Sequence, residues 1–548
     1  MHERLPFTSD SSLGELSEVE RRLCDMFLRG DLLDLRTGDQ EKDDPERSAE
    51  WGRERQVRAE LIVALLLAAV EPDPGRVAIL RLAGARVIGD LSLAYAEVRA
   101  PLLLRECSFD KPICLDEATV RSVNLTGSTI PRLEADNARI EGHLVLDACR
   151  LQSVVLTDVH IAGHLSLSRA CLTNPQGNAL NADGLVVEGD MFCRNGFQTE
   201  GEVRLLGARV AGQLNFSGAR LTNPQGNALN ADQLFVEGSM FCKDGFQAEG
   251  EVRLLGARVA GQLNFNGARL INPTQDALSA DQLVVDGGMF CQQGFQAEGE
   301  IRLSGARVTG QIGFNDARLT NPGRVALSCV DVEAASLWMA QGFVVDGDVD
   351  FSGTRVRTLF DNPACWPASM DVNELVYNDL EPDLPARERL HWLRACGKEY
   401  RAQPYEQLAA YYRRQGHDEE ARRVLLAKQR RHRASRPWYA RIWGYLLDGL
   451  VGYGYRPGRA ALWVLALLTA GSVFFTYHQP QPIKAGEHPL YQPVLYTADV
   501  LLPIINLGQE SAFKHQGVAQ WVASVLILLG WVFATALIAG ITRVLTRN

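Results

Sequence analysis

Apolar residues follow a regular beat from residue 87 onward. They recur every ten or eleven residues, and a small residue usually stands two positions before each one. Two steps of this beat make a turn of about 21 residues. A chain that returns to an apolar position at so short an interval is expected to wind into a solenoid, whose stacked coils share one apolar column. The positions are Val87, Val98, Phe109, Val120, Ile130, Ile140, Leu151, Ile161 and Leu172.

The beat continues inside a longer repeat. The pattern that begins with "GHLSLSRACLTNPQGNAL" at Gly163 returns at Gly212, Gly261 and Gly310, each time 49 residues on. The beat is stretched there to Leu185, and four steps fill one repeat, so one repeat is expected to span two coils. Short two-periodic pieces such as "GQLNF" and "EVRLL" predict strands.

We therefore predict a mainly β fold: a right-handed, quadrilateral-like β-solenoid over residues 78–360. About 12 coils fit in this range, and at about 4.8 Å per coil the column is about 55–60 Å long. The pattern places Leu214 in the apolar column and its neighbour Gln213 in solvent.

The N-terminal residues 1–77 are expected to form a helical cap. Ser17 and Glu20 have capping-box spacing ahead of an amphipathic run, and residues 53–70 read as a second helix. Such a cap covers the first coil, whose open edge would otherwise recruit other strands.

The segments after the solenoid are expected to be helical as well. Residues 361–403 read as a linker and helix, and residues 404–458 as a helical neck: a hairpin that turns at Gly416, followed by a juxtamembrane segment. Aromatic rings stand among arginines at 438–445, which is typical of a membrane interface.

Two uncharged runs predict transmembrane helices within a two-span membrane module, residues 459–548. Ala460 to Tyr477 is uncharged for 18 residues and Val518 to Ile541 for 24. Each is long enough to cross a hydrocarbon layer of about 30 Å, so the lipid bilayer is the first predicted partner. The inter-span loop is 478–517.

Basic residues predict the orientation of the spans. Residues 421–447 hold eight Lys or Arg and no acid, while the inter-span loop holds only Lys484 and Lys514. By the positive-inside rule, both termini and the solenoid face the cytoplasm of a bacterial inner membrane.

Net charge and cysteine content limit the partners and the compartment of the protein. The net charge of -10 argues against a nucleic-acid partner. The 11 cysteines include no CxxC pair, so we expect reduced thiols in a cytoplasmic protein.

The stretch "GYGYRPG", residues 452–458, contains the Gly-Tyr-Gly of a potassium-selectivity filter. A filter lies between spans where subunits line a pore, whereas this stretch precedes both spans. Its glycines also fail the GxGxxG spacing of a dinucleotide-binding loop. We interpret it as a juxtamembrane joint.

The chain resembles bacterial pentapeptide-repeat-type β-solenoid membrane proteins with a C-terminal two-span module. The resemblance rests on "GARVAGQLNFSGARL" at 207–221 and, in the C-terminal half, on "VGYGYRPGRA" and "LYTADVLLPIINLGQE". Some of these relatives carry the label membrane-associated oxidoreductase, which the resemblance implies as one function. It supplies no catalytic residue to carry over.

Two sets of side chains are candidates for chemical sites. His143 and His164 would stack on adjacent coils about 5 Å apart, close enough to share a metal, but glutamines hold the equivalent positions of later coils, so a solvated position is favoured. The cysteines of the repeated "MFC" would lie about 10 Å apart, beyond disulfide reach, and are interpreted as buried thiols. They are Cys193, Cys242 and Cys291.

Charged residues form ladders that either keep the solenoid soluble or bind a protein partner. The loops at 173–178, 222–227, 271–276 and 320–325 are expected to project from one edge, which suits multivalent contact. The candidate partner face is Glu202, Arg204, Arg209, Glu251, Arg253, Arg258, Glu300, Arg302 and Arg307.

The inter-span segment 491–510 has the layout of a pore-loop channel: span, short helix, loop, span. A helix over 492–502 would be followed by extended backbone. Non-helical backbone at membrane depth must be satisfied by protein or water, so channel use implies a homo-oligomer. An interfacial re-entrant helix is the alternative. The candidate residues are Pro503, Ile504, Ile505, Asn506, Leu507 and Gly508.

Three functions follow, in this order. The first is a non-enzymatic, membrane-anchored scaffold or sensor that presents the solenoid to a cytoplasmic partner. The second is an oligomeric channel regulated by the solenoid. The third is an oxidoreductase; because no dinucleotide fingerprint, haem motif or redox cysteine pair is present, we predict no cofactor and name no catalytic or metal-binding residue.

Overall fold

The computed structural model describes residues 14–68, 75–367, 369–395, 400–434, 445, 457–483, 490–502, 504–514 and 516–545. The chain divides into two compact units. The first comprises Met1–Leu384 with His391–Gly397, and the second comprises Pro385–Leu390 with Lys398–Asn548.

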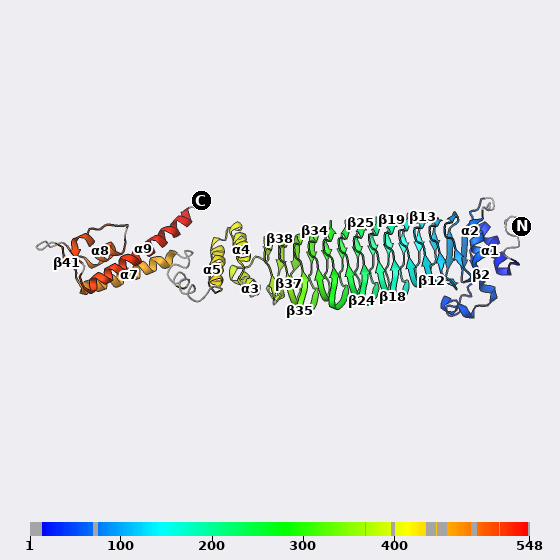
Figure 1. Cartoon of the computed structure of the whole chain (residues 1–548), viewed down its shortest axis with the longest axis horizontal. Coiled ribbons are helices and arrows are strands. Elements are labelled where there is room, and N and C mark those ends of the chain that lie inside the picture. Colours follow the sequence, from blue (N-terminus) through cyan, green and yellow to red (C-terminus); the bar gives the residue numbers. More distant parts are fainter. Residues whose placement is uncertain are drawn as a thin grey trace. The chain divides into compact units, whose positions relative to one another are not determined.

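The first unit is a parallel β-solenoid of about 13 turns (Figure 1), which confirms the predicted fold class. Its strands form a 24-stranded and a 16-stranded sheet, in which each strand pairs with its counterpart one coil on. The handedness stays a prediction.

The 24-stranded sheet comprises β1 (Leu33–Asp34), β3 (Leu80–Ala83), β6 (Glu97–Val98), β7 (Leu102–Arg105), β10 (Thr119–Val120), β11 (Val123–Asn124), β13 (Arg139–Ile140), β14 (Leu144–Val145), β16 (His160–Ile161), β17 (Leu165–Ser166), β19 (Val186–Val187), β20 (Met191–Phe192), β22 (Arg209–Val210), β23 (Leu214–Asn215), β25 (Phe235–Val236), β26 (Met240–Phe241), β28 (Arg258–Val259), β29 (Leu263–Asn264), β31 (Val284–Val285), β32 (Met289–Phe290), β34 (Arg307–Gly313), β36 (Glu333–Met339), β38 (Arg355–Asp361) and β40 (Val376–Glu381).

The 16-stranded sheet comprises β2 (Gln56–Arg58), β4 (Arg86–Ile88), β5 (Leu91–Ser92), β8 (Ser108–Phe109), β9 (Ile113–Cys114), β12 (Thr129–Glu134), β15 (Arg150–Val155), β18 (Cys171–Asn181), β21 (Gln198–Arg204), β24 (Arg220–Asn230), β27 (Gln247–Arg253), β30 (Arg269–Ser279), β33 (Gln296–Arg302), β35 (Arg318–Ser328), β37 (Val344–Asp350) and β39 (Met370–Asp371).

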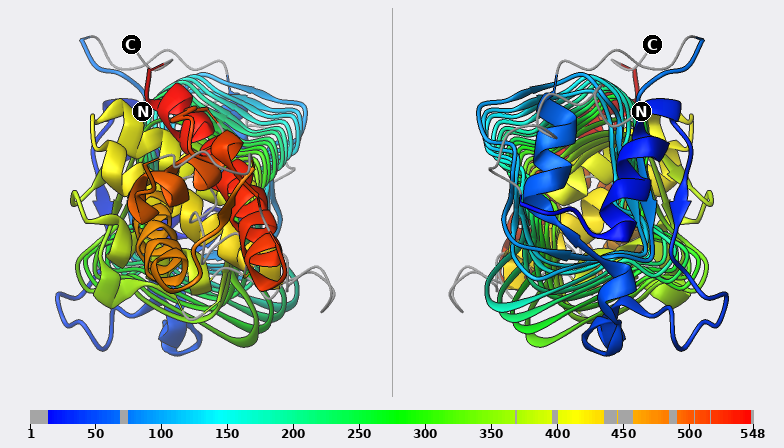
Figure 2. Two further views of the ribbon diagram at one scale, coloured as in Figure 1. Left: turned by 90° about the vertical axis from the view of Figure 1, so that its left-hand side faces the viewer. Right: turned by 90° about the vertical axis from the view of Figure 1, so that its right-hand side faces the viewer.

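Each coil has four sides, as Figure 2 shows in views along the column. In the coil that begins with β21, ladder pairing occurs at four places in succession, which we call sides 1 to 4. Sides 1 and 2 belong to the 16-stranded sheet, and sides 3 and 4 to the other. The pairs are Thr199 with Leu221 on side 1, Val203 with Leu229 on side 2, Val210 with Val236 on side 3, and Leu214 with Met240 on side 4.

One 49-residue repeat spans two coils, as predicted. Cys171 pairs with Gln198, and Gln198 pairs with Arg220, so the two coils take 27 and 22 residues and together 49. The longer coil carries the Asn-Pro loop, which explains why the apolar beat stretches there.

The apolar beat marks the core of the solenoid. Every residue of the beat from Val87 to Leu172 is buried, and Leu214 is fully buried while Gln213 is partly exposed. Phenylalanines fill the centre of the column in pairs, for example Phe216 and Phe246, whose ring centroids lie 6.3 Å apart in an edge-on arrangement. This continuous column is the main stabilisation, since one coil alone buries too little apolar surface.

The N-terminal cap covers the first coils. The capping box predicted at Ser17 and Glu20 begins α1 (Glu18–Arg29). The predicted helix over 53–70 begins only at Ala59, as α2 (Ala59–Leu67).

Two features explain the late start of α2. Residues Gln56–Arg58 join the 16-stranded sheet beside β4, and Arg55 bonds Asp43. The segment before them holds two 3₁₀ turns, η2 (Pro45–Glu50) and η3 (Arg53–Arg55).

Helices dominate the second unit. They are α4 (Gln403–Arg414) and α5 (Asp418–Ala434), which form the predicted hairpin around Gly416, then α7 (Pro457–Tyr477), α8 (Pro493–Leu501) and α9 (Val518–Leu545). In the last coil η4 (Pro363–Cys365) precedes β39 and β40, so the solenoid continues past residue 360. Helix α3 (Ala386–Ala395) contributes residues to both units.

Helices α7 and α9 contain the two predicted spans. Gly458–Tyr477 and Val518–Thr535 are long and apolar enough to cross a membrane. The inter-span segment also contains η6 (Glu510–Ala512) and a small hairpin of β41 (Gln481–Pro482) and β42 (Phe513–Lys514). Most of "GYGYRPG" and Pro503 lie outside the described residues.

Candidate functional site

Four loops bulge from the corner between sides 1 and 2, along the edge where β18, β24 and β35 are labelled in Figure 1. In the first loop the ladder pairs Thr173 and Asn178 with residues of β21 but leaves the residues between them unpaired. Pro175, Gln176 and Gly177 are exposed. Because the loops occur on every second coil, their tips repeat at about 10 Å.

The four loops are closed by the same hydrogen bond. The Asn174 side-chain Nδ2 donates to the Asn178 carbonyl at 2.9 Å, and the corresponding asparagines, Asn223, Asn272 and Asn321, bond the carbonyl four residues on at 2.8, 2.7 and 2.6 Å. An asparagine that bonds the backbone in this way fixes a turn locally.

A glycine of the neighbouring coil supports each of the first two loops. Gly201 has φ of 110°, and a Cβ there would overlap the carbonyl oxygens of Asn174 and Gly177. Gly250 repeats this arrangement under the second loop. The loops therefore rest directly on backbone, which favours one conformation in each copy.

The arginines of the predicted ladder on side 2 bind acids of the preceding coil. Arg204 pairs with Asp183 at 2.6 Å, Arg253 with Asp232 at 2.8 Å, and Arg302 with Asp281 at 2.9 Å. These side chains are half-buried and connect one coil to the next. Their accompanying glutamates, Glu202, Glu251 and Glu300, lie beside them on the same strands.

The second ladder lies on side 3, across a turn from the first. Arg258 pairs with Asp286 at 3.3 Å, Arg307 lies 3.8 Å from Glu333, and the Arg209 guanidinium lies over the Phe235 ring. The structure therefore places the nine residues of the candidate partner face on two adjacent sides.

A polar cavity of about 380 Å³ separates the third and fourth loops. Arg324 closes part of it by donating to the Thr274 carbonyl at 3.0 Å. Burial, with the nearby Asp276 carboxylate, raises the pKa of Glu300 in its wall. The cavity lies at the same corner as the loop tips.

The chain matches no protein-family model, no curated protein and no solved structure. The pentapeptide-repeat resemblance and the oxidoreductase label stay expectations.

His143 and His164 stack as predicted, with ring centroids 5.1 Å apart. Each Nδ1 accepts a backbone N–H from the next coil: His164 N–H donates to His143 and Asp190 N–H to His164, both at 2.9 Å. One nitrogen of each ring thus serves to join the coils.

The repeated cysteines lie in the apolar column. Cys193, Cys242 and Cys291 are fully buried, and burial raises the pKa of each thiol far above its ordinary value. A thiol held neutral is a poor nucleophile and a poor metal ligand. These residues fill space beside the phenylalanines.

The second candidate site is the inter-span segment. Helix α8 packs against both long helices at glycines: a Cβ on Gly471 of α7 would overlap the Thr497 side chain, and one on Gly530 of α9 would overlap the Leu501 carbonyl. The core around α8 includes Phe475, Tyr496, Val500, Phe513 and Leu526.

Asp499 organises the loop that follows α8, and sequence reasoning missed it. Its buried carboxylate accepts backbone N–H groups from Leu507 at 2.6 Å and from Gln509 and Glu510, both at 2.7 Å. The signal available was that it is the only acid between Tyr491 and Gln509.

The loop presents apolar side chains outward. Ile504, Ile505 and Leu507 are 67%, 49% and 42% exposed, while Asn506 Oδ1 accepts the Gly508 N–H at 2.9 Å. Apolar groups held outward on a fixed backbone require an apolar or protein environment. Pro503, the first residue of the predicted site, lies outside the described residues.

Proposed function

We propose that the chain is a membrane-anchored scaffold that binds a protein partner through the corner between sides 1 and 2. The anchor is the pair α7 and α9 in a bacterial inner membrane, and the solenoid faces the cytoplasm. The proposal assigns no cofactor, metal or catalytic residue.

One observation carries this proposal: the repetition of a rigid, exposed loop. The hexapeptide "TNPQGN" at 173–178 recurs unchanged at 222–227, with the same asparagine bond and a supporting glycine. Structure repeated at fixed spacing, with solvent-exposed tips, suits a partner that touches several tips at once, and such avidity compensates for weak single contacts.

The third and fourth loops modify the same surface. Asp276 and Arg324 introduce charges absent from the first two loops, beside the polar cavity. Ordered polar loops lose little conformational entropy on binding, because the glycine and asparagine contacts already fix their backbone. We expect the first two, uncharged loops to supply repeated contacts. Asp276 and Arg324 would then fix where along the column the partner binds.

Site-specific photo-crosslinking in cells tests the proposal. A photoreactive residue at Gln176 or Gln225 should capture the same protein, and the same residue at exposed Glu188 on side 3 should not. A photoreactive residue in place of Asp276 should also capture this protein. That capture should be lost when both hexapeptides are shortened to a two-residue turn. Equal capture at Glu188, or none at either loop tip, would refute the assignment of this corner.

A second function, an oligomeric channel, is supported by Asp499. Three charge-assisted hydrogen bonds hold a non-helical segment beside two span-length helices, and that is more order than a simple anchor needs. Bilayer recordings from purified oligomers decide the matter. Current that changes with Asn506→Leu supports the channel, and silence in a verified oligomer argues against it.

A further inference from the structure

The fourth copy of the repeat breaks the charge pattern on side 3. The first three copies place an acid at Glu188, Glu237 and Asp286, at intervals of 49 residues. His160 pairs with the first at 2.9 Å and Arg258 with the third at 3.3 Å. The fourth copy places Ala335 at the equivalent position and carries its acid two residues earlier, at Glu333, where the third copy has Val284.

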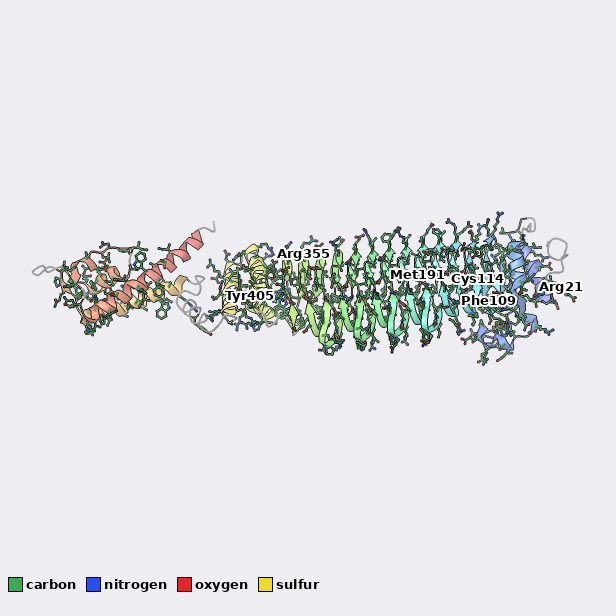
Figure 3. The ribbon with its side chains drawn as sticks, viewed as in Figure 1. Arg21, Phe109, Cys114, Met191, Arg355 and Tyr405 are labelled. Atoms are coloured by element: carbon green, nitrogen blue, oxygen red, sulfur yellow. The ribbon has the colours of Figure 1, made fainter. Side chains whose placement is uncertain are left out.

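Three arginines surround this displaced acid. A shallow cavity of about 620 Å³ is lined by Arg307, Arg355 and Arg357 but by one acid, Glu333. Glu333 lies 3.8 Å from Arg307 and 3.4 Å from Arg355. No carboxylate within the described residues lies at ion-pair distance from Arg357. We call these three arginines the basic patch; Figure 3 labels Arg355 on the outer surface of the last coils.

Side 2 changes in the opposite sense. Arg204, Arg253 and Arg302 recur in the first three copies, and along the ladder Arg302 is followed by Ser328 and then Asp350. The fourth copy thus has an aspartate where the others have an arginine.

Two exposed aspartates stand beside Asp350, at positions where the earlier copies also carry acids. Asp346 follows Glu298 on the ladder through Thr320, and Asp348 stands two residues further on, as Glu300 does after Glu298. Asp346 and Asp348 stand on the same strand, β37, on sides 1 and 2. No lysine or arginine of the described chain lies at ion-pair distance from them. We call Asp346, Asp348 and Asp350 the acidic patch.

The two patches lie at the same level of the column. The acidic patch belongs to β37 and the basic patch ends on β38, the next strand along the chain. They occupy neighbouring sides, because the chain turns from side 2 to side 3 between Asp350 and Arg355.

We propose that these patches are the two halves of a contact between copies of this chain. The basic patch of one copy binds the acidic patch of the next, with the columns side by side and parallel. The patches are chemically complementary and occur in the same coils. Each holds one charge that the earlier copies lack: Asp350 stands where the third copy has Arg302, and Arg357 stands where it has Thr309.

A second copy explains both departures at once. An unrelated acidic partner would account for the basic patch alone and leave the acidic patch unexplained. Both patches lie at the same level of one column, so they meet when two parallel columns stand level with each other. This inference does not depend on the partner proposed for the loop-bearing corner.

The geometry makes the contact head-to-tail, and such contacts close into rings. Adjacent sides of a four-sided column face directions about 90° apart, so the ring closes after about four copies. Exposed ion pairs are individually weak and are screened beyond about 8 Å at physiological salt, so assembly should weaken as salt rises.

Charge reversal of the full-length protein in lipid nanodiscs, with mass measured by native mass spectrometry, tests the proposal. Asp346→Arg with Asp348→Arg reverses the acidic patch, and Arg355→Asp with Arg357→Asp reverses the basic patch. Each pair alone should reduce the oligomer at least tenfold. Co-expression of the two variants should restore an oligomer in which they alternate, and the chain with all four changes should assemble with itself.

Two controls separate assembly from folding. Arg99→Asp with Arg121→Asp makes the same change of charge on side 3 of early coils and should leave the oligomer intact. Ala335→Glu restores the acid of the earlier repeats and should weaken assembly without unfolding the chain.

The proposal is overturned if the wild-type protein is monomeric, or if folded single-patch variants assemble as the wild type does. It is also overturned if the co-expressed variants stay apart. None of these results bears on whether the loop tips bind their partner, which the crosslinking experiment decides separately.

Discussion

At the scale of single residues, glycine decides where one coil can approach the next. Gly201 lies under the first loop with φ of 110°, and there the added Cβ would meet two backbone oxygens. Gly196, five residues earlier, has φ of 94° but open space around it. A side chain at Gly196 would therefore meet backbone strain alone, whereas one at Gly201 would meet both strain and steric overlap.

We predict that Gly201→Ala lowers the thermal midpoint of the full-length protein much more than Gly196→Ala. Both changes place a side chain at positive φ, at a cost of about 1–3 kcal/mol, but only the first must also displace the loop. Circular dichroism melting of the two variants measures the difference. Equal losses would show that the loop does not rest on Gly201.

Adjacent residues of one strand should differ most in their tolerance of a charge where one of them faces the apolar column. Leu214→Asp introduces a charge into a fully buried site and should cost about 4 kcal/mol or more. Gln213→Asp changes a partly exposed neighbour and should cost about 0.5 kcal/mol or less. Thermal melts of both variants provide the comparison, and similar losses would contradict the alternation of inside and outside.

At the scale of elements, the N-terminal segment 37–55 acts as a strap on the first coils. Asp43 accepts the N–H groups of Thr37 and Gly38 and pairs with Arg55 at 2.9 Å. Burial tends to raise the pKa of Asp43, but these bonds outweigh it and hold the pKa below its ordinary value. Trp51 stacks on Arg55 within the strap.

The strap should loosen in acid. A carboxyl whose pKa is lowered by folding stabilises the folded state above its unfolded pKa of 3.8, and that contribution is lost as the pH falls through the lower folded value. The fluorescence of Trp51, obtained by subtracting the signal of Trp51→Phe, should change over this range. Asp43→Asn should show the loosened signal already at neutral pH; an unchanged signal would exclude this role.

Helix α8 and its loop depend on Asp499. Asp499→Asn replaces one accepting oxygen by a donor that faces backbone N–H groups, which should cost about 2–3 kcal/mol and free the loop. A cysteine placed at Ile505 should then react faster with a membrane-impermeant thiol reagent. Glu510→Gln, at an exposed position of the same loop, is the control and should leave the rate unchanged.

Periodic features were predictable from the sequence, and long-range polar contacts were not. The 49-residue repeat, the buried beat and the two span-length helices each follow from spacing alone. The strap, the bond between Arg55 and Asp43 and the role of Asp499 depend on which residues meet in space. Residues 53–58 show the limit: their helical pattern yields to an ion pair and to pairing with β4.

The charge ladders illustrate the same limit within the solenoid. Their spacing was visible, but not that the arginines of side 2 bind aspartates of the preceding coil, nor that Arg209 stands on a different side from Arg204. In a four-sided column, the positions of the turns decide on which side each residue lies. The spacing of residues in the sequence does not define where those turns fall.

At the scale of the whole molecule, the direction of the chain through the membrane fixes which compartment the solenoid occupies. Both proposed contacts, with a cytoplasmic partner and between copies, require the solenoid and the C-terminus on one side. Basic residues flank the two spans and few lie in the inter-span loop, so the positive-inside rule predicts that this side is the cytoplasm. Two spans return the chain to the side from which it started.

Fusion of alkaline phosphatase, which is active only outside the cytoplasm, tests this arrangement. A fusion at His488, between the spans, should be active, and a fusion at Asn548 should be inactive, because the positive-inside rule retains both flanks in the cytoplasm. A fluorescent protein that folds only in the cytoplasm should give the reverse pattern at the same two positions. Phosphatase activity at Asn548 with none at His488 would place the loop-bearing corner outside the cytoplasm and would exclude a cytoplasmic partner.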